Sequence, residues 1–168
     1  EKISRKPSKI AQKLIKSFWP GPLTLVLRSK SIPETVNAGG KTVAVRMPSN
    51  KTALKFIREC GVPIAAPSAN LFGRLSPVSY SHVKKQLGPM VDGIIKSGRC
   101  EIGLESTIID VSGKRPKILR TGFITEEDIK KKAGIRITHV KKTRIKYPGK
   151  FKRHYSPQTP LEFMTGSQ

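Results

Sequence analysis

The sequence is poor in cysteine and in long apolar runs. Its 168 residues include two cysteines, Cys60 and Cys100, which are too few for a disulfide framework, so we expect two reduced, buried thiols. No apolar run approaches the roughly 20 residues of a membrane span. The first thirty residues show no signal-peptide pattern. These absences argue against a membrane-spanning or disulfide-stapled chain, and we expect a cytoplasmic protein.

Acidic residues are also scarce. Eleven Asp and Glu stand against 33 Lys and Arg, which gives a net charge of +22. Fifteen of the basic residues lie between Lys114 and Arg153, a segment with only three acids. A positive field attracts polyanions at long range, so nucleic acid or nucleotide phosphate is a natural partner. Lysines that only maintain solubility would give the same composition, so charge alone leaves both interpretations open.

Several common catalytic motifs are missing. Neither G-x-x-x-x-G-K-[ST] nor G-x-G-x-x-G occurs, which excludes the two common phosphate loops. The cysteines have no zinc-ligand spacing with His82 or His139, which we expect on a solvated helix and at a strand end. Ser68 and Ser106 lie outside any G-x-S-x-G elbow. A covalent nucleophile therefore has little support.

Helical and strand patterns alternate along the chain. Residues 31–42 are expected to be loop, and Gly113 is expected at the turn of a hairpin, which implies antiparallel pairing. We therefore expect an α/β fold with a mixed, strongly twisted open sheet and helices on its faces. The predicted helices cover 8–19, 49–60, 76–88 and 125–134, and the predicted strands cover 23–27, 42–48, 62–67, 91–98, 105–113 and 116–122.

The apolar pattern thins after Val140, where proline and basic residues increase. Residues 141–160 are therefore expected to form an extended linker. We expect one α/β domain over residues 1–140 and the start of a further domain in residues 161–168.

Polar side chains interrupt or follow several predicted strands. Each has an ordinary explanation, such as an edge arginine or a helix N-cap at Ser76. Ligands of open α/β sheets bind at the carboxyl ends of strands, so the group as a whole suits a phosphate-bearing ligand and a small carboxylate. Its members are Arg46, Ser68, Asn70, Ser76, Ser106, Thr107 and Arg120.

Five long segments, in order, carry a resemblance to a known family. They are FWPGPLTLVL, TVAVRMPS, PIAAPSANLFGRLSP, DGIIKSGRCEIGLESTIIDVSG and ILRTGFIT. They resemble the YrdC-like family, specifically its threonylcarbamoyl-AMP synthases, and YPGKFKRHYSPQTPL is similar to the linker of the two-domain members. The resemblance runs from about residue 10 to 163. It implies a twisted α/β sheet with a large, concave, positively charged cavity.

The resemblance also implies an activity. Family members make threonylcarbamoyl-AMP and pyrophosphate from L-threonine, bicarbonate and ATP, with Mg²⁺ accompanying the ATP. The product serves tRNA threonylcarbamoyladenosine modification, so a downstream tRNA threonylcarbamoyl transferase is an expected partner. Such chemistry requires oriented reactants and compensation of phosphate charge, and no covalent nucleophile.

The family's functional residues map onto this sequence one by one. For L-threonine, the resemblance implies contacts from Ala66, from Ser106 and from Arg46, which would hold the carboxylate. For the nucleotide, it implies Thr42, Ser68, Asn70, Ser76 and Arg120, and His154 or Tyr155 closing over the adenylate from the linker.

The sequence departs from the family pattern at both ends and at Phe72, and the family's C-terminal domain is expected to stop after its first few residues here. The family's T-x-Y-G-L and K-x-R motifs are expected before residue 1, and SRKPS at 4–8 does not match them. We therefore expect an internal fragment of a longer protein, one that binds ATP poorly by itself. Phe72 stands where a small residue is usual, and we expect it to pack on its own helix.

Two other interpretations remain. The basic face could hold double-stranded RNA or tRNA without catalysis, a use that the +22 charge favours. The carbamoyl-transferring module of hydrogenase maturation proteins shares this domain, but the chain lacks its flanking zinc-finger cysteines. The linker motif favours the synthase over both.

Overall fold

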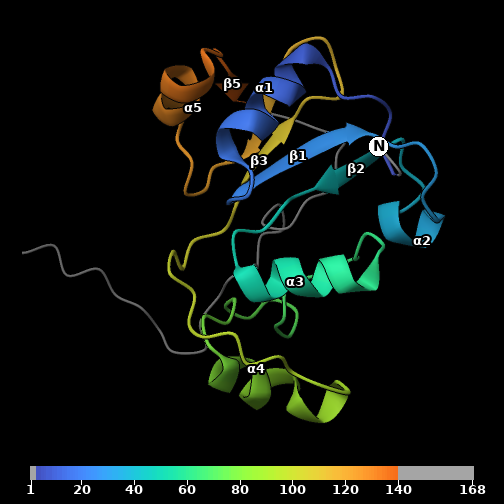
Figure 1. Ribbon diagram of the computed structural model, residues 1–168, viewed down its shortest axis with the longest axis vertical. Helices are drawn as coiled ribbons and strands as arrows, with labels where there is room; N and C mark the ends of the chain where they lie inside the picture. The colour runs from blue at the N-terminus through green and yellow to red at the C-terminus, as the bar shows by residue number, and fades with distance from the viewer. Residues whose placement is uncertain (1–2, 140–168) are drawn as a thin grey trace, which may run out of the picture. The chain divides into compact units, whose positions relative to one another are not determined.

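The structure, a computed structural model, describes residues 3–139. These fall into two compact units, one of residues 3–65 with 104–139 and one of residues 66–103. The elements, labelled in Figure 1, are α1 (Lys9–Phe18), β1 (Leu23–Arg28), α2 (Glu34–Asn37), β2 (Thr42–Val45), α3 (Lys51–Cys60), α4 (Tyr80–Leu87), the 3-10 turn η1 (Gly88–Met90), β3 (Thr107–Asp110), β4 (Lys117–Arg120), α5 (Glu126–Ala133) and β5 (Thr138–His139).

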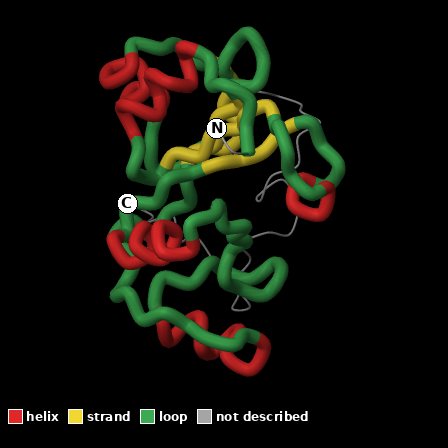
Figure 2. Tube along the Cα trace, turned by 45° about the vertical axis from the view of Figure 1, so that its right-hand side comes forward, coloured by secondary structure: helices red, strands yellow, loops and turns green. Residues whose placement is uncertain are grey.

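The first unit is built on one five-stranded sheet, whose strands Figure 2 shows together in yellow. The strand order is β2-β1-β3-β4-β5. Strand β1 pairs antiparallel with β2 and parallel with β3, and β3 pairs antiparallel with β4, which pairs parallel with β5. The predicted mixed α/β sheet and its hairpin around Gly113 are confirmed.

The core of this unit lies between the sheet and two helices. Leu23, Leu25 and Leu27 of β1 are buried on one face of the sheet, because successive side chains of a strand point to opposite faces, and Val26 is buried on the other. The three leucines belong to the core cluster. They pack with apolar side chains of α1 and α5, two helices that lie side by side in Figure 1. The central members of the cluster are Leu14, Phe18, Leu23, Leu25, Leu27, Ile109 and Ile129.

Side-chain caps explain where three predicted helices begin. Ser8 Oγ accepts a hydrogen bond from the Ala11 amide at 3.3 Å, and Asn50 Oδ1 accepts one from the Ala53 amide at 2.9 Å. Thr125 and Asp128 form a reciprocal capping box at the start of α5. The helices predicted over 8–19, 49–60 and 125–134 are thereby confirmed.

The structure corrects four predicted elements. Residues 31–42 contain the short helix α2, and the segments 62–67 and 91–98 form no strand. A strand needs a neighbour to receive its hydrogen bonds, and neither segment pairs with the described sheet. The helix predicted over 76–88 begins only at Tyr80, because Ser79 rather than Ser76 caps it, through a 3.4 Å bond from the His82 amide.

Two predicted packing environments are wrong as well. Cys60 and Cys100 are free, as expected, but both are exposed rather than buried. Phe72 is 81% exposed and so does not bury itself against its own helix.

Among residues 3–139, no helix is long and apolar enough to cross a membrane. The predicted linker (141–160) and further domain (161–168) lie outside the described residues.

Candidate functional site

Polar side chains converge where β3 begins and β4 ends. The Arg120 guanidinium donates to the Ser106 carbonyl from Nε at 3.1 Å and from Nη2 at 3.0 Å. Nη2 also lies 3.1 Å from Ser106 Oγ and 3.4 Å from Glu105 Oε2. Ser106 Oγ in turn lies 2.8 Å from Thr24 Oγ1 on β1. Three adjacent strands thus contribute to one hydrogen-bonded cluster of Thr24, Glu105, Ser106 and Arg120.

A bulge in β4 precedes Arg120 and helps to place its side chain in this cluster. The β3–β4 pairing shifts between Ile108, opposite Arg120, and Ile109, opposite Ile118, so β4 carries one extra residue. That residue, Leu119, is buried like Ile118, which interrupts the usual alternation. A bulge of this kind redirects the side chains that follow it. Arg120 is the next residue, and it reaches back to Ser106.

Gly122 allows the chain after β4 to approach this point. A Cβ at position 122 would lie 2.3 Å from the Glu105 carbonyl oxygen and 2.5 Å from the Thr107 nitrogen. Both atoms are backbone, so no side-chain movement could relieve the overlap. The Phe123 amide donates to the Glu105 carbonyl at 3.3 Å across the same approach. Position 122 therefore requires glycine for close contact.

Thr107, one of the polar residues noted in the sequence, has a structural role. Its side chain is fully buried. Its Oγ1 donates to the Ile124 carbonyl at 2.6 Å and accepts from the Ile124 amide at 3.1 Å. Both bonds remain inside the protein, so Thr107 fixes the segment after β4 rather than facing a ligand.

Arg46 lies at the same end of the sheet. It follows β2, which ends at Val45, so it does not interrupt a strand as predicted. Leu25 pairs with Val45, and the Gly21 amide donates to the Met47 carbonyl at 2.8 Å, so the ladder brings Arg46 opposite Thr24. The Arg46 side chain is exposed. The structure therefore brings together Arg46, Ser106 and Arg120, three of the predicted site residues.

Thr42 occupies the other end of β2. It pairs with Arg28, the last residue of β1. Arg46 lies four residue steps further along the chain, which corresponds to roughly 13 Å at the usual rise per residue of a strand. In a strand, residues i, i+2 and i+4 line the same face of the sheet, so Thr42 and Arg46 share a face. The spacing is compatible with an extended ligand along β2.

The second unit holds four predicted site residues, Ala66, Ser68, Asn70 and Ser76. Asn70 Nδ2 donates to the Leu71 carbonyl at 2.8 Å and to the Arg74 carbonyl at 3.2 Å. Both amide hydrogens are therefore used inside their own loop. A phosphate could reach them only by replacing one of these bonds, so the predicted phosphate contact of Asn70 stays a prediction. His154 and Tyr155 lie outside the described residues.

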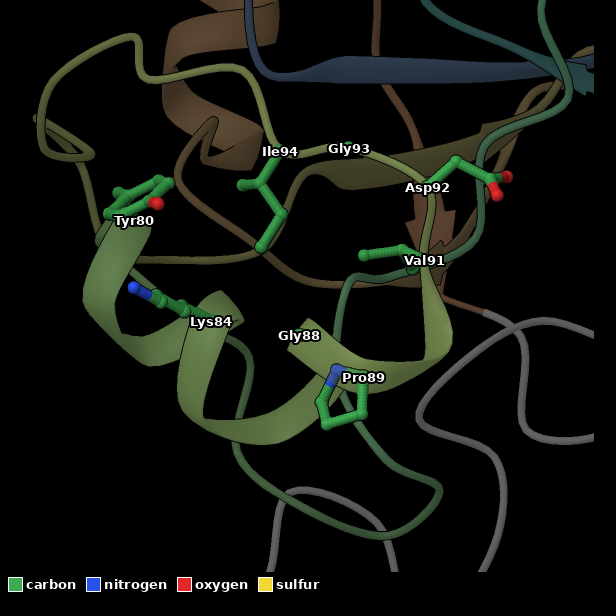
Figure 3. A pocket seen from close by; sticks show the side chains of 8 residues that line it. All are labelled: Tyr80, Lys84, Gly88, Pro89, Val91, Asp92, Gly93 and Ile94. Carbon is green, nitrogen blue, oxygen red and sulfur yellow. The ribbon is translucent and has the colours of Figure 1, made fainter.

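Each unit has a shallow cavity of its own. In the second unit, Figure 3 shows one of about 400 Å³ in which Tyr80 and Lys84 of α4 face the segment after η1. The first unit has another of about 380 Å³, lined by Ser4, Arg5, Lys6 and Lys30. None of the predicted site residues lines either one. The large concave cavity that the resemblance implies stays a prediction.

Residues 3–139 contain no group of three His, Cys, Asp or Glu side chains that could hold a metal ion. Magnesium commonly retains its waters and binds through substrate phosphates with few protein ligands, so a Mg²⁺ that arrives with ATP would need no such group. The Mg²⁺ that the resemblance implies stays a prediction.

Sequence reasoning missed Thr24, Glu105 and Gly122. Thr24 is hidden inside the apolar strand LTLVL, where a β-branched residue needs no explanation. Glu105 and Gly122 adjoin Ser106 and Arg120, but only the strand pairing brings these neighbours together. A lone threonine inside an apolar strand was the one available signal.

Fold and cluster together define a class. This is an α/β protein with a mixed open sheet that gathers arginine and hydroxyl side chains at one end, an arrangement suited to anionic ligands. The Sua5/YciO/YrdC family model, described as "Telomere recombination", matches residues 1–122. The chain belongs to this family.

The relatives agree with one another. The chain is 44% identical over 165 residues to a threonylcarbamoyl-AMP synthase of Bacillus subtilis, covering 94% of this chain and 47% of the relative. It is 41% identical over 172 residues to the same enzyme of Pyrococcus abyssi, covering 99% and 51%. The chain thus spans about half the length of these curated relatives.

Solved structures support the fold. The chain superimposes on P. abyssi Sua5 complexed with L-threonine with a TM-score of 0.80 and 40% identity, covering 94% of this chain and 48% of that one. It superimposes on E. coli YciO with a TM-score of 0.62 and 27% identity, covering 69% and 57%.

Proposed function

We propose that this chain is part of an L-threonylcarbamoyladenylate synthase. The observation that carries the proposal is the gathering of Arg46, Ser106 and Arg120 at one end of the sheet, in a chain about 40% identical to synthases along nearly its whole length. A relative of this fold binds L-threonine, which requires a carboxylate partner such as an exposed arginine.

The proposed reaction proceeds in two stages. The amine of L-threonine condenses with bicarbonate to give a carbamate, with loss of water. A carbamate oxygen then attacks the α-phosphorus of ATP and forms the P–O bond of threonylcarbamoyl-AMP. The bond between that phosphorus and the bridging oxygen breaks, and pyrophosphate leaves with the electron pair.

The protein's part in this reaction is to orient the reactants and to balance charge. Arg46 binds the threonine carboxylate, with Ala66 and Ser106 beside the amino acid. Arg120, Thr42, Ser68, Asn70, Ser76 and His154 or Tyr155 contact the nucleotide. Mg²⁺ bound to ATP offsets phosphate charge. Prepositioned donors of this kind stabilise developing charge without reorganisation during the reaction.

The activity test uses the full-length protein with ATP, bicarbonate and each amino acid in turn. Pyrophosphate release that depends on threonine supports the proposal, and release that does not depend on threonine contradicts it.

Arg46→Ala is expected to lower kcat/KM for threonine by about 100-fold, because it removes charge-assisted hydrogen bonds to the threonine carboxylate, whose loss typically has an effect of this size. Arg136→Ala, at another exposed arginine, is the matched control and should leave it unchanged. Unchanged activity in Arg46→Ala would refute this placement of the carboxylate.

A second candidate function follows from the charge of +22. A basic face that holds double-stranded RNA or tRNA would bind without ATP and weaken steeply with salt. Tight, salt-dependent tRNA binding together with absent pyrophosphate release would favour this alternative. For the synthase, a tRNA threonylcarbamoyl transferase in the cytoplasm is the proposed recipient of the product.

A further inference from the structure

We infer that Thr24 is a positioning residue that acts through Ser106 to direct the Arg120 guanidinium toward the nucleotide. The inference rests on the proposed function, which makes Arg120 a nucleotide contact. Thr24 belongs to β1, whereas Ser106 and Arg120 belong to the β3–β4 hairpin. The three side chains meet although Thr24 and Ser106 are 82 residues apart in the sequence.

The direction of the hydrogen bonds defines the role. A guanidinium only donates, so Ser106 Oγ must accept from Arg120 Nη2. A hydroxyl has one proton and two lone pairs, and Arg120 occupies one of the lone pairs. Thr24 Oγ1 at 2.8 Å takes the proton or the second lone pair. In either case the Thr24 hydroxyl holds Ser106 in the rotamer that accepts from Arg120.

Burial makes the orientation of Arg120 depend on these particular hydrogen bonds. Ser106 is only 4% exposed and the Arg120 side chain only 13% exposed, so water is poorly placed to substitute for a lost partner. Nε and Nη2 of Arg120 are directed at Ser106 and Glu105, which fixes the plane of the guanidinium. The donors of a guanidinium form a rigid planar fork, so the orientation of this plane determines which ligand atoms the Arg120 guanidinium can contact.

Thr24 itself has no assigned contact with a reactant. It is partly buried within β1 and pairs with Ile108. Its hydroxyl is therefore explained by Ser106 alone, whereas a valine would satisfy the strand equally well. A role through Arg120 predicts an effect on nucleotide binding that a purely structural threonine would lack.

The test compares Thr24→Val, Thr24→Ser and the control Thr138→Val, an exposed strand threonine on β5, in the full-length protein. Calorimetric titration with Mg·ATP is expected to show about fivefold weaker binding for Thr24→Val, the usual value of one hydrogen bond. Thr24→Ser should restore binding, and Thr138→Val should match the wild type. Thr24→Val binding equal to wild type, or not rescued by serine, overturns the inference.

A spectroscopic measurement keeps the test independent of turnover. The Arg120 Nε–H resonance, assigned with an Arg120→Lys variant, should be resolved and slowly exchanging in the wild type and Thr24→Ser. It should move toward the bulk arginine signals in Thr24→Val. A resonance unmoved in Thr24→Val contradicts the inference. Pyrophosphate release is read separately, so its absence refutes the proposed function alone.

A double-mutant cycle with Ser106→Ala locates the effect. If Thr24 acts through Ser106, adding Thr24→Val to Ser106→Ala should weaken ATP binding no further. Additive losses would mean that Thr24 acts by another route and would overturn the inference. Melting temperatures of the four proteins identify any loss that reflects unfolding.

Discussion

The two units of the described chain differ sharply in how they are held together. Of the residues that the structure describes, the sixteen buried apolar ones all lie in residues 3–65 and 104–139. Residues 66–103 contain no buried residue. The first unit fixes its polar cluster through strand pairing and a core, whereas the second carries its predicted site residues on a segment without a core.

The hydrogen bonds show the same contrast. In the first unit, Thr24 meets Ser106 across 82 residues of sequence. In the second, the side-chain bonds of Asn70 and Gln86 reach partners at most 15 residues away. The difference teaches that the arginine–serine cluster is specified by tertiary structure, whereas the Ser68–Ser76 loop is specified by local turn chemistry.

The largest expected difference is in amide hydrogen exchange. Amides of β1 and β3 are protected by strand pairing beside the core and should open only with global unfolding. Amides of residues 66–103 should exchange about a thousandfold faster or more, because no core opposes their opening. Exchange measured by NMR or mass spectrometry tests this, and equal protection in both units would remove the contrast.

The second prediction truncates one apolar side chain in each unit. Leu25→Ala should lower the free energy of unfolding by about 3–4 kcal/mol, since Leu25 is fully buried between β2 and β3. Ile95→Ala should cost less than about 0.5 kcal/mol, since Ile95 is 58% exposed. Urea denaturation measures both values. A comparable loss at Ile95 would show that its side chain is covered in solution.

The third prediction concerns the approach of Gly122 to the start of β3. Gly122→Ala places a Cβ against backbone atoms of Glu105, Ser106 and Thr107 and should cost about 2–3 kcal/mol. Gly113→Ala is the matched control, because a Cβ there meets nothing within 4 Å. Arg120 should lose its contacts with Ser106 in the first variant. Equal stability of the two variants would contradict the close approach.

Sequence patterns predicted the capped helices and the β3–β4 hairpin of the first unit well, but they missed α2 in that unit and predicted strands over 62–67 and 91–98 that do not form. Helices with caps and apolar stripes, such as α1 and α5, were predicted almost to the residue, because cap and stripe are local signals. The β3–β4 hairpin followed from its turn at Gly113 and its β-branched residues. Segments 62–67 and 91–98 look like strands by composition, but composition cannot say whether a partner strand is present.

The candidate site shows the same limit. Arg46, Ser106 and Arg120 could be singled out as polar residues at strand ends. That Arg120 bonds to Ser106, and that Thr24 supports it, depends on the register of three strands and on one bulge. Register is a long-range property, so neither Thr24 nor Gly122 could be assigned a role from spacing alone.

The smallest expected effect lies at the exposed rim of the well-packed unit. The Thr125 amide donates to Asp128 Oδ2 at 3.0 Å and the Thr125 hydroxyl donates at 2.8 Å, and these bonds lower the pKa of Asp128 below its ordinary value of 3.8. Because the pKa is lower in the folded state than in the unfolded state, the capping box contributes its full stabilisation of α5 at pH values above the ordinary pKa of 3.8. The stabilisation is lost as the pH falls through the lowered pKa.

Asp128→Asn should therefore reduce the protection of α5 slightly at about pH 6, and it should reduce the change in protection that occurs as the pH falls from about 6 through the lowered pKa of Asp128. Glu127→Gln, in the same turn but outside the capping box, should leave that change in place. Amide exchange along α5 measures both. The core beneath, centred on fully buried Ile129, should hold the helix in every variant, since burial outweighs one exposed cap. Loss of α5 in Asp128→Asn would show instead that the cap, and not the core, sustains this helix.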